Sequence, residues 1–143
     1  MKKILSLAIL TLLAIQVTAA EWMTDLDKAK AIAKKENKLV FIDFTGSDWC
    51  PPCIKLKKDV LSTAEFAKYA KEKFVLVELD YPRSKEQSVE LKAANRELQQ
   101  QFKIKGFPTV VILDGEGKEV LRKVGFGGED IAGYLKQFEG LKK

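Results

Sequence analysis

Short apolar runs alternate with stretches of helical periodicity along this chain, which is the pattern of a mixed α/β protein. Residues 39–44 and 74–79 are almost continuously apolar and rich in strand formers, which is typical of buried strands. Residues 109–113 and 119–124 flank a glycine-containing turn and predict a β-hairpin. Helices are expected over residues 24–35, 50–58, 62–72, 86–102 and 129–141.

The order of these elements predicts how the strands pair. A helical crossover separates the first two strands, and such a connection joins parallel strands of one sheet. The last two strands are joined by a tight turn, so they should be antiparallel. We therefore expect an α/β fold with a mixed four-stranded sheet, made of two parallel strands plus an antiparallel hairpin, with helices on both faces.

The first twenty residues differ from the rest of the chain and have the layout of a secretory signal peptide. Lys2 and Lys3 precede the apolar run 4–15, and small residues at 17–20 provide a cleavage site. The alternative is an uncleaved membrane anchor, but the run is shorter than the roughly 20 apolar residues of a spanning helix. We expect loss of residues 1–20, which leaves one domain over 21–143, periplasmic or secreted and not inserted in a membrane.

The composition supports a folded domain and argues against nucleic-acid binding. The chain has 46% hydrophobic and 31% charged residues, which is enough apolar content for a core. Its formal net charge is +5, and loss of Lys2 and Lys3 with the signal peptide leaves +3. Because acids and bases are mixed without a basic stripe, this weak excess does not indicate a nucleic-acid partner.

Both cysteines lie in one motif, Trp49-Cys50-Pro51-Pro52-Cys53, and the chain has no histidine. A disulfide over so short a loop constrains the unfolded chain little, so the pair is placed for chemistry and not as a staple. A permanent disulfide that only rigidifies the turn is the alternative. Structural zinc needs four ligands, which two thiolates alone do not provide, so we predict no metal site and no cofactor.

The position of the motif suits thiol–disulfide exchange, which needs one thiolate to attack and a second thiol to resolve the mixed disulfide. Cys50 is expected at a helix start, where unpaired N–H groups and the helix dipole favour its thiolate. The two prolines fit the first helical positions, whose N–H groups have no partner inside the helix. Cys53 should lie one turn further in, less exposed than Cys50 and suited to resolution.

Four segments in this order resemble the thioredoxin superfamily over residues 39–135. They are Phe41-Ile42-Asp43-Phe44, the cysteine motif with its tryptophan, Gly106-Phe107-Pro108-Thr109 and Lys123-Val124-Gly125. The chain is also similar to exported thioredoxin-like domains, such as the carboxy-terminal domain of the electron-transferring protein DsbD. The resemblance implies a thioredoxin-like fold and thiol–disulfide oxidoreductase activity.

The resemblance also implies roles for single residues. Cys50 would be the attacking thiol and Cys53 the resolving one. Pro108 would be the family's cis-proline, facing the cysteines and presenting backbone to a substrate strand. Phe107 and Trp49 would join Pro108 in binding the substrate, and Trp49 would also support the site.

Two acids are further candidates for supporting the chemistry. Asp43 matches the family's buried acid, although its spacing to Cys50 is one residue longer than usual. Glu78 stands where thioredoxins often carry lysine, which would place two acids beneath the site instead of an acid–base pair. Burial and Glu78 should raise the pKa of Asp43 and make it a proton acceptor for Cys53. The alternative is that Asp43 only hydrogen-bonds the loop 45–48.

These features predict an enzyme that exchanges disulfides with exported proteins bearing cysteines. The helix start favours an oxidant, whereas similarity to an electron-transferring domain favours a reductant, and we favour the reductant. A membrane electron-transfer protein is a further candidate partner, and we expect a monomer. The alternative function is a thioredoxin-fold binding or chaperone module with a non-catalytic or sensory disulfide.

Overall fold

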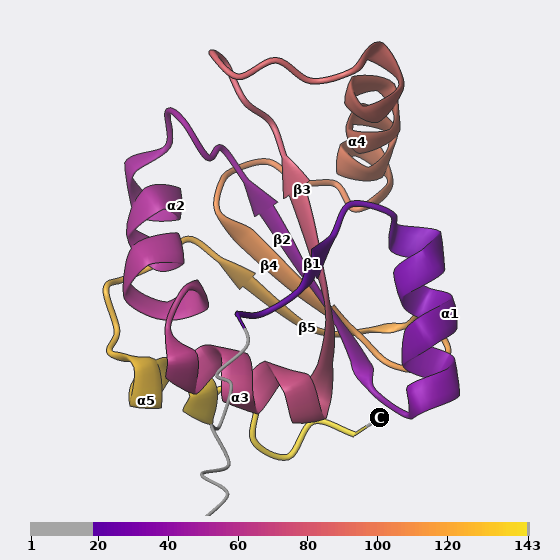
Figure 1. The fold of residues 1–143 in the computed structure, drawn as a ribbon, viewed down its shortest axis with the longest axis vertical. Coiled ribbons are helices and arrows are strands. Elements are labelled where there is room, and N and C mark those ends of the chain that lie inside the picture. Colours follow the sequence, from indigo (N-terminus) through magenta and orange to yellow (C-terminus); the bar gives the residue numbers. More distant parts are fainter. Residues whose placement is uncertain (1–18, 143) are drawn as a thin grey trace, which may run out of the picture.

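The computed structural model describes residues 19–142, so the predicted signal peptide lies outside the described residues except for Ala19 and Ala20 (Figure 1). The elements in chain order are β1 (Trp22–Met23), α1 (Leu26–Glu36), β2 (Leu39–Thr45), α2 (Pro51–Leu56), a π-helical turn (Lys57–Leu61), α3 (Ala64–Lys73), β3 (Phe74–Asp80), α4 (Val89–Gln101), β4 (Thr109–Leu113), β5 (Glu119–Val124) and α5 (Ile131–Lys136).

The strands form one mixed sheet in the order β1-β3-β2-β4-β5. The two expected parallel strands, β2 and β3, are paired as predicted, and β4 and β5 form the expected antiparallel hairpin. The hairpin joins the sheet through β4, which is antiparallel to β2. The sheet has five strands and not the expected four, because β1, a strand of two residues, pairs in parallel with β3. So short a strand has no periodicity that a sequence pattern can reveal.

Helices cover both faces of the sheet, with α1 and α4 on one face and α2, α3 and α5 on the other (Figure 1). Because β2 is buried on both sides, it reads as an almost continuous apolar run. Its side chains alternate between two cores, Phe41 in one and Ile42 and Phe44 in the other.

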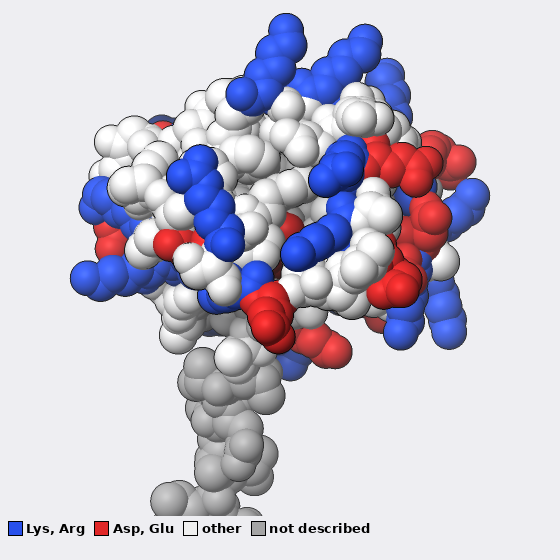
Figure 2. Space-filling view, turned by 90° about the horizontal axis from the view of Figure 1, so that it is seen from above, with Lys and Arg blue, Asp and Glu red and all other residues white. Residues whose placement is uncertain are grey.

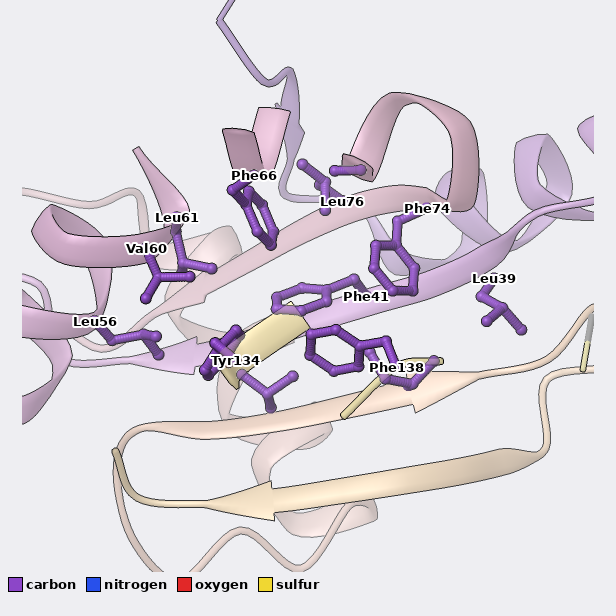
Figure 3. Close-up of a cluster of buried hydrophobic side chains, with 13 residues drawn as sticks. Leu39, Phe41, Leu56, Val60, Leu61, Phe66, Phe74, Leu76, Tyr134 and Phe138 are labelled. Carbon is purple, nitrogen blue, oxygen red and sulfur yellow. The ribbon is translucent and has the colours of Figure 1, made fainter. Parts of the chain in front are cut away.

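Phe41 lies at the centre of an aromatic group on the face of α3 and α5 (Figure 3). Its ring centroid is 5.6 Å from that of Phe66, 5.4 Å from Phe74 and 5.8 Å from Phe138. Trp22 of β1 adds a further edge contact at 5.9 Å, so this tryptophan is a packing residue. Such aromatic pairs contribute about 0.5–1.5 kcal/mol each beyond the area they bury.

The helix boundaries differ from the sequence pattern in three places. The helix after the cysteines continues as the π turn to Leu61, and α3 then starts at a Thr63 cap whose Oγ1 accepts the Phe66 N–H at 3.2 Å. Ser88 caps α4, so this helix begins three residues later than expected. α5 ends at Lys136 and not at residue 141. Within residues 19–142, no helix is both long and apolar enough to cross a membrane.

Candidate active site

The two cysteines lie where the chain leaves β2 and enters α2. Cys50 is the N-cap residue of α2, with extended backbone angles, and its carbonyl accepts the Ile54 N–H at 3.0 Å. Pro51 and Pro52 occupy the first two helical positions, as the motif predicted, because those positions need no N–H donor. Cys50 and Cys53 form a disulfide with their Cα atoms 5.2 Å apart.

The expected difference in exposure between the two cysteines is wrong. Cys50 is 3% exposed and Cys53 is 2% exposed, because both sulfurs are held in one covered disulfide. Their surroundings still differ. The Sγ atom of Cys53 accepts the Gly46 N–H at 3.5 Å, and Cys53 also lines a pocket of about 310 Å³ together with Lys57, Glu78 and other residues.

The segment before β4 carries the predicted cis bond, between Phe107 and Pro108. The carbonyl of Pro108 accepts the Gly125 N–H at 2.7 Å, so it is engaged inside the protein. In the described part of the chain, the backbone N–H and carbonyl of Phe107 have no such partner. The Phe107 backbone is therefore the part of this segment that can still form hydrogen bonds with a partner strand.

Trp49 and Phe107 are brought together, as the expected substrate-binding residues should be. Their rings meet edge to face with centroids 5.9 Å apart, and Tyr81 packs on Phe107 at 5.1 Å. Trp49 donates its Nε1–H to the Tyr81 carbonyl at 2.8 Å, and the Arg83 guanidinium lies 3.9 Å from the indole centroid. The indole is thus fixed by one hydrogen bond and two packing partners.

Asp48 fastens the loop after β3 to the cysteine loop, a contact that the sequence pattern did not reveal. Its carboxylate accepts the backbone N–H groups of Arg83 at 3.0 Å, Ser84 at 2.7 Å and Lys85 at 2.9 Å. These hydrogen bonds hold the pKa of Asp48 below its ordinary value, and the bond from the Arg83 N–H has the largest effect. The partners are more than thirty residues away in sequence, so no local signal could have identified them.

Asp43 is buried beneath the motif, as predicted, with 2% of its surface exposed. Its pKa is raised to about 7, first by burial and then by the nearby Glu78 carboxylate, while Lys57 opposes the rise. Its Oδ1 atom has no hydrogen-bond partner among the described residues. The alternative role in holding the loop belongs to Asp80, whose carboxylate accepts the Ser47 N–H at 2.9 Å.

Glu78 lies beside Asp43 on the neighbouring parallel strand, as a direct register partner. The expectation that two acids replace an acid–base pair is corrected here, because Glu78 forms an ion pair with Lys57 of the π turn. The Lys57 Nζ atom also lies 4.5 Å from the centroid of Trp22. The basic residue beneath the site is therefore Lys57 of the π turn after α2, and not a residue of strand β3.

The comparison with known families agrees with this geometry. The model of the thioredoxin-like domain family matches residues 26–139. The chain belongs to this family.

Known relatives of this thioredoxin-like chain are named for disulfide chemistry. Disulfide bond reductase DsbH of Chlamydia pneumoniae is 37% identical over 111 residues, covering 78% of this chain and 66% of that protein. A solved structure described as DsbH oxidoreductase has a TM-score of 0.76 at 34% identity, covering 85% of this chain and 83% of that one. The expected similarity to DsbD is confirmed for the Vibrio vulnificus protein, 33% identical over 96 residues, which are 67% of this chain and 15% of that protein.

The thioredoxin-like site has the parts that two-electron exchange needs. The Cys50–Cys53 disulfide can be reduced to a dithiol and the dithiol oxidised back to the disulfide, a two-electron change, and a buried carboxyl with a pKa of about 7 lies beneath the pair. Among residues 19–142, no group of three or more cysteine, aspartate and glutamate side chains is arranged to hold a metal ion.

Proposed function

We propose that this protein is an exported thiol–disulfide oxidoreductase that reduces disulfides of other exported proteins through Cys50 and Cys53. The observation that carries the proposal is the redox pair itself, placed at the start of α2 in a thioredoxin-like chain. The reductase name of the relative DsbH supports the direction of electron flow. The chain spans 66% of DsbH and 15% of DsbD, so their full activities and partners are not carried over.

The reaction transfers two electrons from the dithiol to the substrate disulfide. The Cys50 thiolate attacks one substrate sulfur, forms a mixed disulfide and displaces the other substrate sulfur as a thiolate. The Cys53 thiolate then attacks the Cys50 sulfur, which releases the second substrate thiolate and leaves the Cys50–Cys53 disulfide. A membrane electron-transfer protein that donates two electrons by the same exchange would restore the dithiol.

Substrate binding is assigned to the surface formed by Trp49, Phe107 and Pro108. The Phe107 backbone has an N–H and a carbonyl without partners in the described structure, which suits pairing with an extended substrate segment. Trp49 and Phe107 stand edge to face beside it and offer an aromatic wall.

Asp43 is assigned as the proton acceptor for Cys53. A carboxyl with a pKa of about 7 can take a proton from a thiol at neutral pH and return it, which an ordinary aspartate does poorly. A pocket lined by Cys53, Lys57 and Glu78 borders the resolving cysteine, on the side of the site where Glu78 neighbours Asp43. The Lys57–Glu78 pair then tunes the pKa of Asp43 from the side of the pocket.

Reduction of insulin by the purified protein tests the function, with Cys50→Ser as the inactive control. Cys53→Ser should accumulate mixed disulfides with substrate proteins, because the attacking thiol is present and the resolving thiol is missing. Cys50→Ser should accumulate none. Equal trapping by both variants would contradict the assigned roles. A wild type that binds unfolded proteins without reducing insulin would favour the binding or chaperone module, and the measured reduction potential decides between reductant and oxidant.

Export is tested by the intact mass of the protein purified from its native host. We expect loss of residues 1–20 and a protein that sediments as a monomer. A mass that retains this segment would favour the membrane anchor instead.

A further inference from the structure

We propose that the rim of the disulfide site, made by Arg83, Lys85 and Lys58, recognises acidic residues next to the reactive cysteine of the partner protein. This inference rests on the proposed function and narrows its substrates. The three side chains come from two segments, the loop after β3 and the π turn after α2. The loop after β3 lies at the upper end of the molecule in Figure 1, and the π turn lies at the far end of α2 from the cysteine loop.

Arg83 is held in a position that leaves its hydrogen-bonding edge available. Its guanidinium stacks on Trp49 at 3.9 Å, and Trp49 directly precedes Cys50. A stacked guanidinium uses its face, so its in-plane N–H groups can still bind a carboxylate with two parallel hydrogen bonds. The Arg83 backbone is itself fixed by Asp48, which lowers the cost of ordering this residue on binding.

The acidic side chains bordering this site already have partners inside the protein. Their pairs are Asp48 with the backbone of 83–85, Asp80 with Ser47, Glu78 with Lys57, and Asp59 with Lys55.

Two of the three basic residues of the rim have no acidic partner in the described structure. Arg83 and Lys58 form no ion pair within residues 19–142. The Nζ atom of Lys85 donates to the Ser47 hydroxyl at 2.9 Å, and this hydroxyl in turn donates to the Asp80 carboxylate. Glu86 is the next acid along the loop, but it lines a separate hollow with Ser88. Arg83 and Lys58 are therefore free to form an ion pair with an incoming carboxylate, beside the charged carboxylates of Asp48 and Asp80.

These basic side chains lie beside the redox pair and not on a remote face. Lys58 and Lys85 line the same pocket as Cys53, and Arg83 covers the tryptophan that precedes Cys50. Figure 2 looks onto this end of the molecule and shows Lys and Arg side chains spread over it, with most acidic side chains toward the right and lower edges. A partner that reaches the disulfide must pass this rim, so an acidic flank on the partner is favoured electrostatically.

The test uses three synthetic peptides that differ only in the residues flanking a single cysteine, which are Glu, Gln or Lys. The cysteine is blocked as a disulfide with 2-mercaptoethanol, a neutral leaving group, and reacts with the reduced protein. We expect second-order rates in the order Glu, Gln, Lys at about 10 mM salt, with about 2- to 5-fold per step, as for exposed ion pairs. At about 1 M salt, where the screening length is about 3 Å, the three rates should converge.

Variants locate the effect on the rim. Arg83→Gln and Lys85→Gln should each reduce the Glu-to-Lys rate ratio, whereas Lys73→Gln should keep it. Lys73 is a matched control because it is exposed and ends α3 at the opposite end of β3. Arg83→Lys keeps the positive charge and should retain part of the Glu-to-Lys rate ratio. This variant therefore tests the role of the charge even if Arg83→Gln disturbs the loop.

The outcomes separate this inference from the proposed function. Equal rates for the three peptides at low salt, with insulin still reduced, would overturn the acidic-partner inference alone. A preference that persists in both rim variants would also overturn it, because the charge would act from elsewhere. Failure with every peptide and with insulin would instead overturn the proposed function.

Discussion

Replacing Asp43 by asparagine should stabilise the oxidised protein, and increasingly so as the pH rises. Asp43 is buried at 2% exposure, its Oδ1 atom has no hydrogen-bond partner in the described structure, and its pKa is raised to about 7 by burial and by Glu78. Ionising this carboxyl inside the fold is therefore costly. Asparagine keeps nearly the same shape and cannot ionise, so it removes this cost.

The size of the effect follows from proton linkage. Between the ordinary pKa of 3.8 and about 7, the folded protein holds a proton on Asp43 that the unfolded chain has released. Because the folded state binds more protons in this range, the free energy of unfolding decreases as the pH rises through it. The difference between the two pKa values corresponds to about 4 kcal/mol, fully expressed above pH 7.

Urea unfolding of the oxidised proteins at pH 4 and pH 8 measures this effect. The advantage of Asp43→Asn over the wild type should grow from near zero at pH 4 to about 4 kcal/mol at pH 8. Glu72→Gln is the control, since it removes an exposed acid on α3 and should show no such growth. An advantage of Asp43→Asn that is the same at both pH values would refute the argument, because Asp43 would then titrate alike in the folded and unfolded chains.

Two further predictions concern the neighbours of the site. Glu78→Gln should lower the pKa of Asp43, because it removes a repelling charge, and Lys57→Met should raise this pKa, because it removes an attracting charge. NMR titration of the Asp43 carboxyl carbon measures both pKa values. Shifts of the pKa in the same direction in the two variants would contradict the assigned contacts. Gly46→Ala should destabilise the oxidised protein by roughly 1–3 kcal/mol in thermal unfolding, because overpacking forces its neighbours to move. The added Cβ would lie 2.5–2.8 Å from atoms of the Trp49 indole, so unchanged stability would contradict this prediction, because it would show that the contact is relieved at no cost.

The sequence was sufficient for most of the fold because the determining signals are local. The buried strands β2 and β3 are continuous apolar runs, and the turn between β4 and β5 is marked by glycines. The place of Cys50 at a helix start follows from the two prolines after it, which few other positions tolerate.

The features that the sequence did not reveal depend on partners far apart in the chain. Lys57 neutralises Glu78 across 21 residues, and Asp48 binds amides more than thirty residues away. The exposure of Cys50 was overestimated because helix-start geometry says nothing about how deeply the disulfide is buried in the fold. Each of these errors arises where tertiary contacts, and not periodicity, decide the environment.

The edge strand β1 sets an order on the assembly of the sheet. Trp22 and Met23 pair with Leu76 and Val77, so each pair closes a separation of 54 residues along the chain. During synthesis these two residues emerge first among the strands, yet their partner strand emerges only after β2, α2 and α3. Parallel pairing over such a distance is slow to form, because the entropy of closing the loop is lost before the contacts are gained. We therefore expect Trp22 to reach its place against Phe41 late, so that its arrival reports completion of the sheet and not its nucleation.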